Sequence, residues 1–132
     1  MFTYNLRILL VEDHPFQLMA TLCLLNSYGF TQVTTADTAD NALQKMNQAH
    51  PPFELLLCDQ CLPDLTGLKL IGIASLQGLI QQAILLSSLN SHELNTLKKA
   101  ADEQRLPLLG YLAKPLQKTE LINLLAPDPR NR

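Results

Sequence analysis

Short apolar runs alternate along the chain with segments of helical periodicity, and this alternation predicts five strands and five helices. The first run, residues 6–11, is apolar almost throughout, which is typical of a strand buried on both faces of a sheet. The same pattern predicts four more strands, over residues 31–35, 53–58, 82–86 and 108–113. The second of these strands is β-branched and less apolar than the others, so we expect it near an edge of the sheet.

The intervals between the strands carry apolar residues at helical spacing. The first helix is expected to begin at His14-Pro15, because proline is favoured at the first helical position, and to end at Tyr28-Gly29. The apolar positions that define the five helical faces are Leu18, Leu22 and Leu25; Ala39, Ala42, Leu43 and Met46; Leu68, Ile71 and Ala74; Leu94, Leu97 and Ala101; and Leu121, Ile122 and Leu125. Strands that alternate with such helices predict an α/β fold, with a parallel sheet covered by helices on both faces.

Length and composition fit one globular domain. The chain has 132 residues, of which 47% are hydrophobic and 17% charged, so it can bury a core and is not a disordered segment. We expect the domain to span residues 1–125, and the polar, proline-punctuated residues 126–132 to form a tail or the start of a linker to an output domain.

Charge and cysteine usage narrow the class of protein. A net charge of −2 gives no basic surface for nucleic acid or an anionic membrane. The apolar runs are too short to span a bilayer, and the N-terminus has no secretory signal pattern. Three cysteines, Cys23, Cys58 and Cys61, fit reduced thiols better than a disulfide framework. We therefore expect a cytoplasmic protein.

Residues with chemical potential follow four of the five predicted strands. Glu12-Asp13, Asp59, Ser87 and Lys114 each stand at the carboxyl end of a strand. Because the carboxyl ends of parallel strands meet at one edge of a sheet, where ligands bind in such folds, we expect these side chains to converge.

Three carboxylates at one edge repel one another unless positive charge compensates them. A magnesium ion, which prefers carboxylate oxygens, water and phosphate, would provide that charge, and Lys114 would provide more. Ser87 adds a hydroxyl that can donate to an oxyanion. An acid that can act as nucleophile, a metal, a lysine and a hydroxyl together suit phosphoryl transfer to a carboxylate.

At this point the sequence resembles the receiver domain of two-component response regulators, over residues 6–125. The resemblance depends on five motifs in order: Leu10-Val11-Glu12-Asp13, Asp59 with Pro63 and Gly67, Leu85-Leu86-Ser87-Ser88, Gly110-Tyr111, and Lys114-Pro115. It implies a flavodoxin-like fold with strand order 2-1-3-4-5.

The resemblance also implies roles for individual residues. Asp59 would accept a phosphoryl group from a sensor histidine kinase or a phosphotransfer protein. Asp13, Asp59 and the backbone carbonyl of Cys61 would bind Mg²⁺, and Glu12 would hold a metal-bound water.

Three further residues would act on the phosphoryl group once it is attached. Lys114 would pair with the phosphoryl oxygens and Ser87 would donate a hydrogen bond to one of them. Tyr111 matches an aromatic residue that changes rotamer as the loop carrying Ser87 moves inward. The Lys114-Pro115 bond is commonly cis in this family.

The resemblance further implies a signalling module that is no enzyme beyond its own phosphorylation and dephosphorylation. Its output or homodimer face would comprise residues 91–104, residues 108–112 and the last helix. Ser88 departs from the alanine or glycine that is usual at its position in the family. The positions of Cys61 and Leu89 influence the phosphoryl lifetime in the family, so that lifetime stays open. The output also stays open, with transcriptional and cyclic-dinucleotide phosphodiesterase domains among the alternatives.

Two other functions compete with this interpretation. Cys58-Asp59-Gln60-Cys61 is a C-x-x-C sequence, which in a cytosolic α/β protein can form a redox pair. The alternative is a docking module that has lost phosphorylation, although no residue that the phosphoryl chemistry requires is missing.

Overall fold

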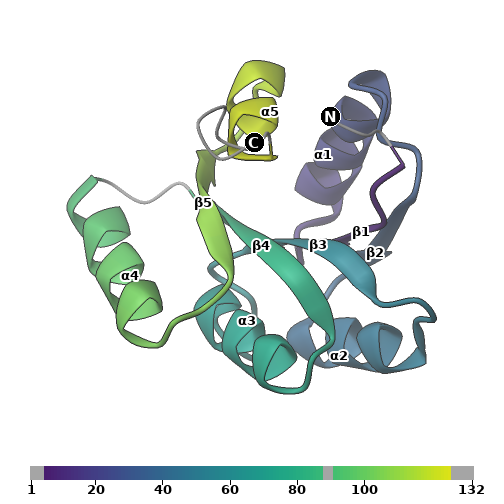
Figure 1. The fold of residues 1–132 in the computed structure, drawn as a ribbon. Coiled ribbons are helices and arrows are strands. Elements are labelled where there is room, and N and C mark those ends of the chain that lie inside the picture. Colours follow the sequence, from purple (N-terminus) through teal and green to yellow (C-terminus); the bar gives the residue numbers. More distant parts are fainter. Residues whose placement is uncertain (1–4, 88–90, 126–132) are drawn as a thin grey trace, which may run out of the picture.

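The predicted strands form one parallel sheet in the order β2-β1-β3-β4-β5, which confirms the expected fold (Figure 1). The computed structural model describes residues 5–87 and 91–125. Its elements in chain order are β1 (Ile8–Val11), α1 (Pro15–Ser27), β2 (Val33–Ala36), α2 (Ala39–Gln48), β3 (Phe53–Asp59), α3 (Gly67–Leu76), β4 (Ile80–Ser87), α4 (Ser91–Glu103), β5 (Leu108–Ala113) and α5 (Lys118–Leu125).

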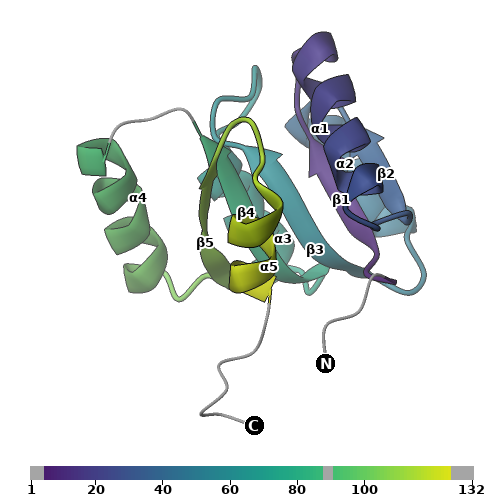
Figure 2. The ribbon, with the colours of Figure 1, turned by 90° about the horizontal axis from the view of Figure 1, so that it is seen from above.

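Helices cover both faces of the sheet and bury a separate apolar core on each. Helices α1 and α5 lie on one face, while α2 and α3 lie on the other and α4 flanks the β5 edge (Figures 1 and 2). Along the central strands, successive residues alternate between the two cores: Leu9 and Leu56 pack beneath α2 and α3, whereas Leu10 and Leu57 pack beneath α1 and α5. Burial on both faces explains the uninterrupted apolar runs in the sequence.

Strand pairing moves the starts of three predicted strands. β1 starts at Ile8, where pairing with β2 begins at Val33, so residues 31 and 32 of the predicted second strand precede the ladder. β4 begins at Ile80 rather than at residue 82, because Ile80 pairs with Phe53. The exposed residues 81 and 82 interrupt the apolar pattern and conceal that start. β2 is an edge strand, as predicted.

Some predictions fall on residues that the structure does not describe. Ser88, Leu89 and the predicted tail, residues 126–132, lie outside the described residues, so the boundary at residue 125 stays a prediction. No helix within the described ranges is long and apolar enough to cross a membrane.

Candidate functional site

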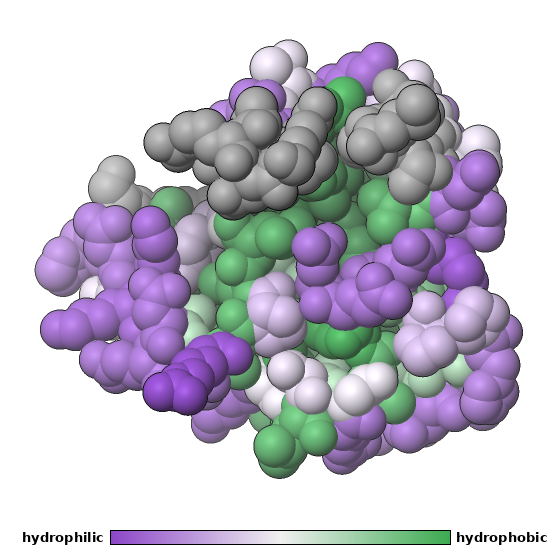
Figure 3. Space-filling model, viewed as in Figure 1, coloured by the Kyte–Doolittle hydropathy of each residue, from purple (hydrophilic) through white to green (hydrophobic). Residues whose placement is uncertain are grey.

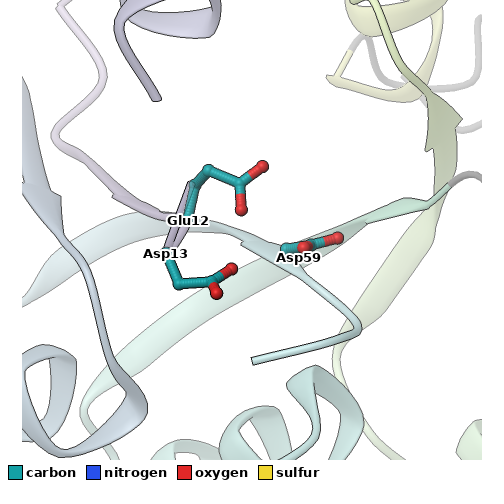
Figure 4. A group of neighbouring side chains, drawn as sticks. All are labelled: Glu12, Asp13 and Asp59. Atoms are coloured by element: carbon teal, nitrogen blue, oxygen red, sulfur yellow. The ribbon is translucent and has the colours of Figure 1, made fainter. Parts of the chain in front are cut away.

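Three acidic side chains converge at the carboxyl edge of the sheet, as the sequence predicts. Glu12 and Asp13 directly follow β1, and Asp59 is the last residue of the neighbouring strand β3. One carboxylate oxygen from each lies within 4.8 Å of the others, and Figure 4 shows the three side chains near one another at the ends of the two strands. Glu12 and Asp59 are only 2% and 8% exposed, while Asp13 is exposed. The cluster is therefore half buried and open on the Asp13 side.

Burial and crowding work against the negative charge of Glu12. Its pKa is raised, first because burial removes water from the carboxylate and then because Asp59 lies nearby, although Lys114 opposes the shift. A divalent cation would relieve this crowding, and carboxylate oxygens are the ligands that Mg²⁺ prefers. The donor set thus fits a magnesium ion.

Lys114 directly follows β5, the last strand in the chain, and brings a positive charge to the acids. Its Nζ donates to Glu12 Oε1 at 3.1 Å, to Asp59 Oδ1 at 3.3 Å and to Gln17 Oε1 at 2.7 Å. Burial acts to lower the Lys114 pKa, but the hydrogen bond to Glu12 and the charge of Asp59 outweigh it and raise the pKa. Lys114 is therefore a fully charged ammonium at neutral pH. The Lys114-Pro115 bond is cis, as the resemblance implies.

The loop between β3 and α3 is closed at its base by two hydrogen bonds that Gln60 accepts. The Gln60 carbonyl accepts from the N–H of Gly67 at 2.9 Å, and its side-chain Oε1 accepts from the N–H of Leu68 at 2.9 Å. An isolated antiparallel bridge joins Cys61 to Thr66 within this loop. The Cys61 backbone is thereby fixed two residues beyond Asp59.

Asp64 ties the tip of the same loop to the start of α2. Its two carboxylate oxygens accept separately from the N–H groups of Ala39, at 3.0 Å, and Asp40, at 2.9 Å. Thr38 caps the same helix by accepting from Asn41 N–H. The hydrogen bonds from Ala39 and Asp40 lower the Asp64 pKa. The loop that follows Asp59 is therefore anchored to the start of α2.

The remaining predicted residues lie around this edge. Ser87 ends β4 with 4% of its surface exposed, one residue beyond Leu86, the β4 partner of Asp59. Tyr111 is half buried in β5, and its buried hydroxyl makes no hydrogen bond to any described residue. Cys61 is exposed in the loop. The roles assigned to these residues by resemblance stay predictions.

Gln17 and Asp64 were not predicted from the sequence. Gln17 lies in the first turn of α1, and its position shortly after Glu12-Asp13 in the chain was the available signal that it lies near the acids. Asp64 gives no comparable signal, because its partners belong to another helix.

The geometry does not support the redox alternative. The Cys58 side chain is completely buried in the core beneath α2 and α3, whereas Cys61 is exposed, and both are free thiols. Burial, reinforced by the charge of Asp59, raises the Cys58 pKa, which disfavours the reactive thiolate.

Comparisons with known proteins agree with this geometry. The family model described as the response regulator receiver domain matches residues 8–126. "Two-component response regulator ORR23" from Oryza sativa subsp. indica is 29% identical over 125 residues, which is 93% of this chain and 17% of that protein. The chain spans about a fifth of the length of the curated relatives that it matches.

Solved structures share the fold. The signal receiver domain of an HD domain-containing protein from Pseudomonas fluorescens Pf-5 superposes with a TM-score of 0.73 at 27% identity, over 92% of this chain and 91% of that one. A CheX–CheY complex with BeF3 and Mg²⁺ from Borrelia burgdorferi gives a TM-score of 0.71 at 18% identity, over 91% of this chain and 86% of that one. The sheet order, the acidic edge and the family match lead to one conclusion: the chain belongs to the response regulator receiver domain family.

Proposed function

We propose that the chain is a phosphoacceptor module that takes a phosphoryl group from a histidine kinase or a phosphotransfer protein onto Asp59. The observation that carries this proposal is the Lys114 ammonium, which donates to both Glu12 and Asp59 at the edge where three carboxylates converge. A cation that lies against a carboxylate in a cleft suits a reaction that places a phosphoryl dianion on that carboxylate.

The proposed step is an in-line displacement at phosphorus. A carboxylate oxygen of Asp59 forms a bond to the phosphorus of phosphohistidine as the phosphorus–nitrogen bond breaks, and the imidazole leaves with the bonding electron pair. Loss of the phosphoryl group later requires water to attack the same phosphorus and release Asp59 as a carboxylate. Asp59 is only 8% exposed, so the donor approaches it from the side of the cluster where Asp13 is exposed.

Asp13, Asp59 and the Cys61 carbonyl would hold Mg²⁺, with Glu12 holding a metal-bound water. The crowded carboxylates described above fit a hard divalent cation, and a protein of the same fold has been crystallised with BeF3 and Mg²⁺. When bound, the metal supplies charge neutralisation for the phosphoryl oxygens. Lys114 supplies the second positive charge, and Ser87 supplies a hydrogen bond to one oxygen.

Phosphorylation would switch a surface formed by α4, β5 and α5. Tyr111 supports this proposal because its buried hydroxyl lacks a hydrogen bond to the described residues, which favours another rotamer. A hollow of about 290 Å³ opens on this surface, lined by Lys98, Asp102, Leu108, Leu109, Gly110, Tyr111 and Leu124. In Figure 3, apolar residues are visible beside the hydrophilic α4, in the region where Figure 1 places β5.

Output or homodimer contacts are therefore proposed for this face. Chemical-shift mapping of the beryllofluoride-treated protein, together with sedimentation velocity, tests the assignment. We expect perturbed amides and any dimer contacts on α4, β5 and α5. Changes confined to β2 and α2 at the opposite edge of the sheet would contradict it.

Intact-mass spectrometry after incubation with acetyl phosphate and magnesium tests the phosphoacceptor. We expect one hydroxylamine-labile phosphoryl adduct on the wild type, none on Asp59→Asn, and an unchanged adduct on Asp102→Asn, an exposed acid of α4. An acyl phosphate on Asp59→Asn would contradict the site. If the wild type shows no adduct, the same assay with the cognate kinase decides between this function and phosphorylation-independent docking. A Cys58–Cys61 disulfide in place of an adduct would favour the redox alternative.

Lys114→Ala separates uptake of the phosphoryl group from its consequence. We expect this variant still to accept the group on Asp59, because the nucleophile is unchanged, but to lose the coupled change on the α4–β5–α5 face. Amide chemical shifts with and without beryllofluoride measure that coupling.

We further propose that the module acts in the cytoplasm, binds neither nucleic acid nor membrane itself, and catalyses only its own phosphorylation and dephosphorylation.

A further inference from the structure

We propose that Gln17 is a positioning residue that orients the Lys114 ammonium toward the phosphoacceptor, an inference that rests on the function proposed above. Gln17 Oε1 accepts from Lys114 Nζ at 2.7 Å, the shortest of the three hydrogen bonds that the ammonium makes to described side chains. Gln17 lies in the first turn of α1, whereas Glu12 directly follows β1 and Asp59 ends β3.

The number of N–H groups on the Lys114 ammonium explains why the contact with Gln17 matters. An ammonium has three N–H groups in a fixed tetrahedral arrangement, and here three acceptors face them. Glu12 at 3.1 Å and Gln17 at 2.7 Å are the two shorter contacts, while Asp59 lies at 3.3 Å. Once two N–H groups are held, the direction of the third is fixed, and it is aimed at Asp59. Phosphoryl oxygens on Asp59 would meet a donor that is already oriented.

The chemical nature of Gln17 suits this role. A lysine ammonium is a point charge on a flexible four-carbon side chain, so it loses rotamer freedom when it is held in one place. The Gln17 amide oxygen restrains it without adding a fourth negative charge to the cluster of Glu12, Asp13 and Asp59. The full positive charge of Lys114 thus stays available to an incoming phosphoryl dianion, in an arrangement formed before the reaction begins.

A double-mutant cycle on the phosphorylation rate tests whether Gln17 acts through Lys114. With acetyl phosphate and saturating magnesium, we expect Gln17→Met to lower the rate of adduct formation about threefold to tenfold, the range for one hydrogen bond. In a Lys114→Ala background we expect Gln17→Met to have no further effect, because the group that it orients is gone. Gln48→Met, at an exposed glutamine of α2, is the matched control and should leave the rate unchanged.

Two outcomes of the cycle would overturn the inference. One is a wild-type rate in Gln17→Met; the other is the same loss in both the wild-type and the Lys114→Ala backgrounds, which would place the effect outside Lys114. Magnesium affinity, measured without phosphodonor, should be the same in Gln17→Met as in the wild type. A parallel fall in that affinity would assign Gln17 to the acid cluster instead.

A readout without any phosphodonor keeps this inference distinct from the proposed function. In ¹⁵N-labelled protein, we expect the Lys114 ammonium protons to exchange with water faster in Gln17→Met than in the wild type. Unchanged exchange would overturn the orienting contact even if the wild type is phosphorylated normally. If the wild type accepts no phosphoryl group from any donor, kinase included, the proposed function fails and its rate consequence fails with it, whatever the exchange shows.

Discussion

Gly67 illustrates how closely single residues determine the site. It begins α3 and packs against the strand that carries Asp59. A Cβ added to Gly67 would lie 2.5 Å from the Asp59 carbonyl oxygen, 2.8 Å from Leu85 Cδ2 and 3.0 Å from Cys58 Sγ. Two of these atoms belong to buried side chains and the third to the backbone of β3, so no flexible group can move aside. Only glycine lets the helix begin this close to the strand that carries Asp59.

We therefore expect Gly67→Ala to lower the free energy of unfolding by about 1–3 kcal/mol through overpacking. Urea denaturation measures this change. Gly72→Ala is the matched control in the same helix, since its added Cβ would meet only Leu106 Cδ2, at 3.9 Å. Replacing a helical glycine by alanine there should be neutral or stabilising by up to about 1 kcal/mol. Equal effects of the two substitutions would contradict the close-contact explanation.

The sequence predicted the residues of the site that depend on strand ends, and missed those that depend on contacts between a loop and a helix. Glu12, Asp13 and Asp59 were predictable because parallel strands end at one edge, and Lys114 reaches the same edge for the same reason. The two contacts of Asp64 depend on how a loop meets another helix, which no local pattern encodes.

At the scale of elements, α2 is held at its start by more than its own sequence. Thr38 is an ordinary N-cap that can be recognised from residue type. The additional cap comes from Asp64, whose carboxylate accepts from the first two N–H groups of the helix and faces the positive end of its dipole. The β strands show the same division, because their existence followed from apolar runs while the starts of β2 and β4 were fixed by their pairing partners.

Asp64→Asn should lower the thermal midpoint at neutral pH, because an amide retains only one of the two acceptors. The Asp64 pKa is lowered in the folded state, so its stabilisation is present above the ordinary aspartate pKa, about 3.9, and is lost as pH falls through the lower folded value. We therefore expect the difference in thermal midpoint between wild type and variant to disappear in that acidic range.

Differential scanning calorimetry across pH measures this difference. Asp37→Asn is the matched control, since Asp37 is an exposed acid near the same helix start that makes no hydrogen bond to the described residues. A difference that persists unchanged into acid, or one that Asp37→Asn reproduces, would show that the carboxylate hydrogen bonds of Asp64 are not responsible.

At the scale of the whole molecule, the apolar cores stabilise the fold, whereas repulsion at the acidic edge works against it. The two cores on either face of the sheet hold the strands together, and the same sheet brings three carboxylates to one end. Burial first, and then the neighbouring Asp59, raise the Glu12 pKa, so the fold holds this carboxylate at an electrostatic cost. The fold class and sheet order were predictable because alternation of elements determines them, whereas this balance of charges depends on distances that only the folded chain defines.

Magnesium should therefore stabilise the entire domain. At a concentration tenfold above its Kd, a ligand that binds only the folded state adds about 1.4 kcal/mol, which corresponds to a rise of about 5 °C in the thermal midpoint of a chain this size. Calorimetry with and without MgCl₂ measures the shift. Asp13→Asn should abolish the shift. Asp102→Asn should retain it, because Asp102 lies on α4, away from the acidic cluster. A full shift in Asp13→Asn would place the ion elsewhere.

The hydrogen bond from Lys114 to Glu12 joins residues 102 positions apart in the chain. The acids are already present in a polypeptide that has been synthesised only as far as β3, but the lysine arrives with the last strand. A chain still emerging from the ribosome, or one cleaved before β5, thus carries a complete set of carboxylates without their cation. Because Lys114→Ala is expected to accept the phosphoryl group but to lose the coupled change on the α4–β5–α5 face, the proposed switch becomes available only after the last strand has been synthesised.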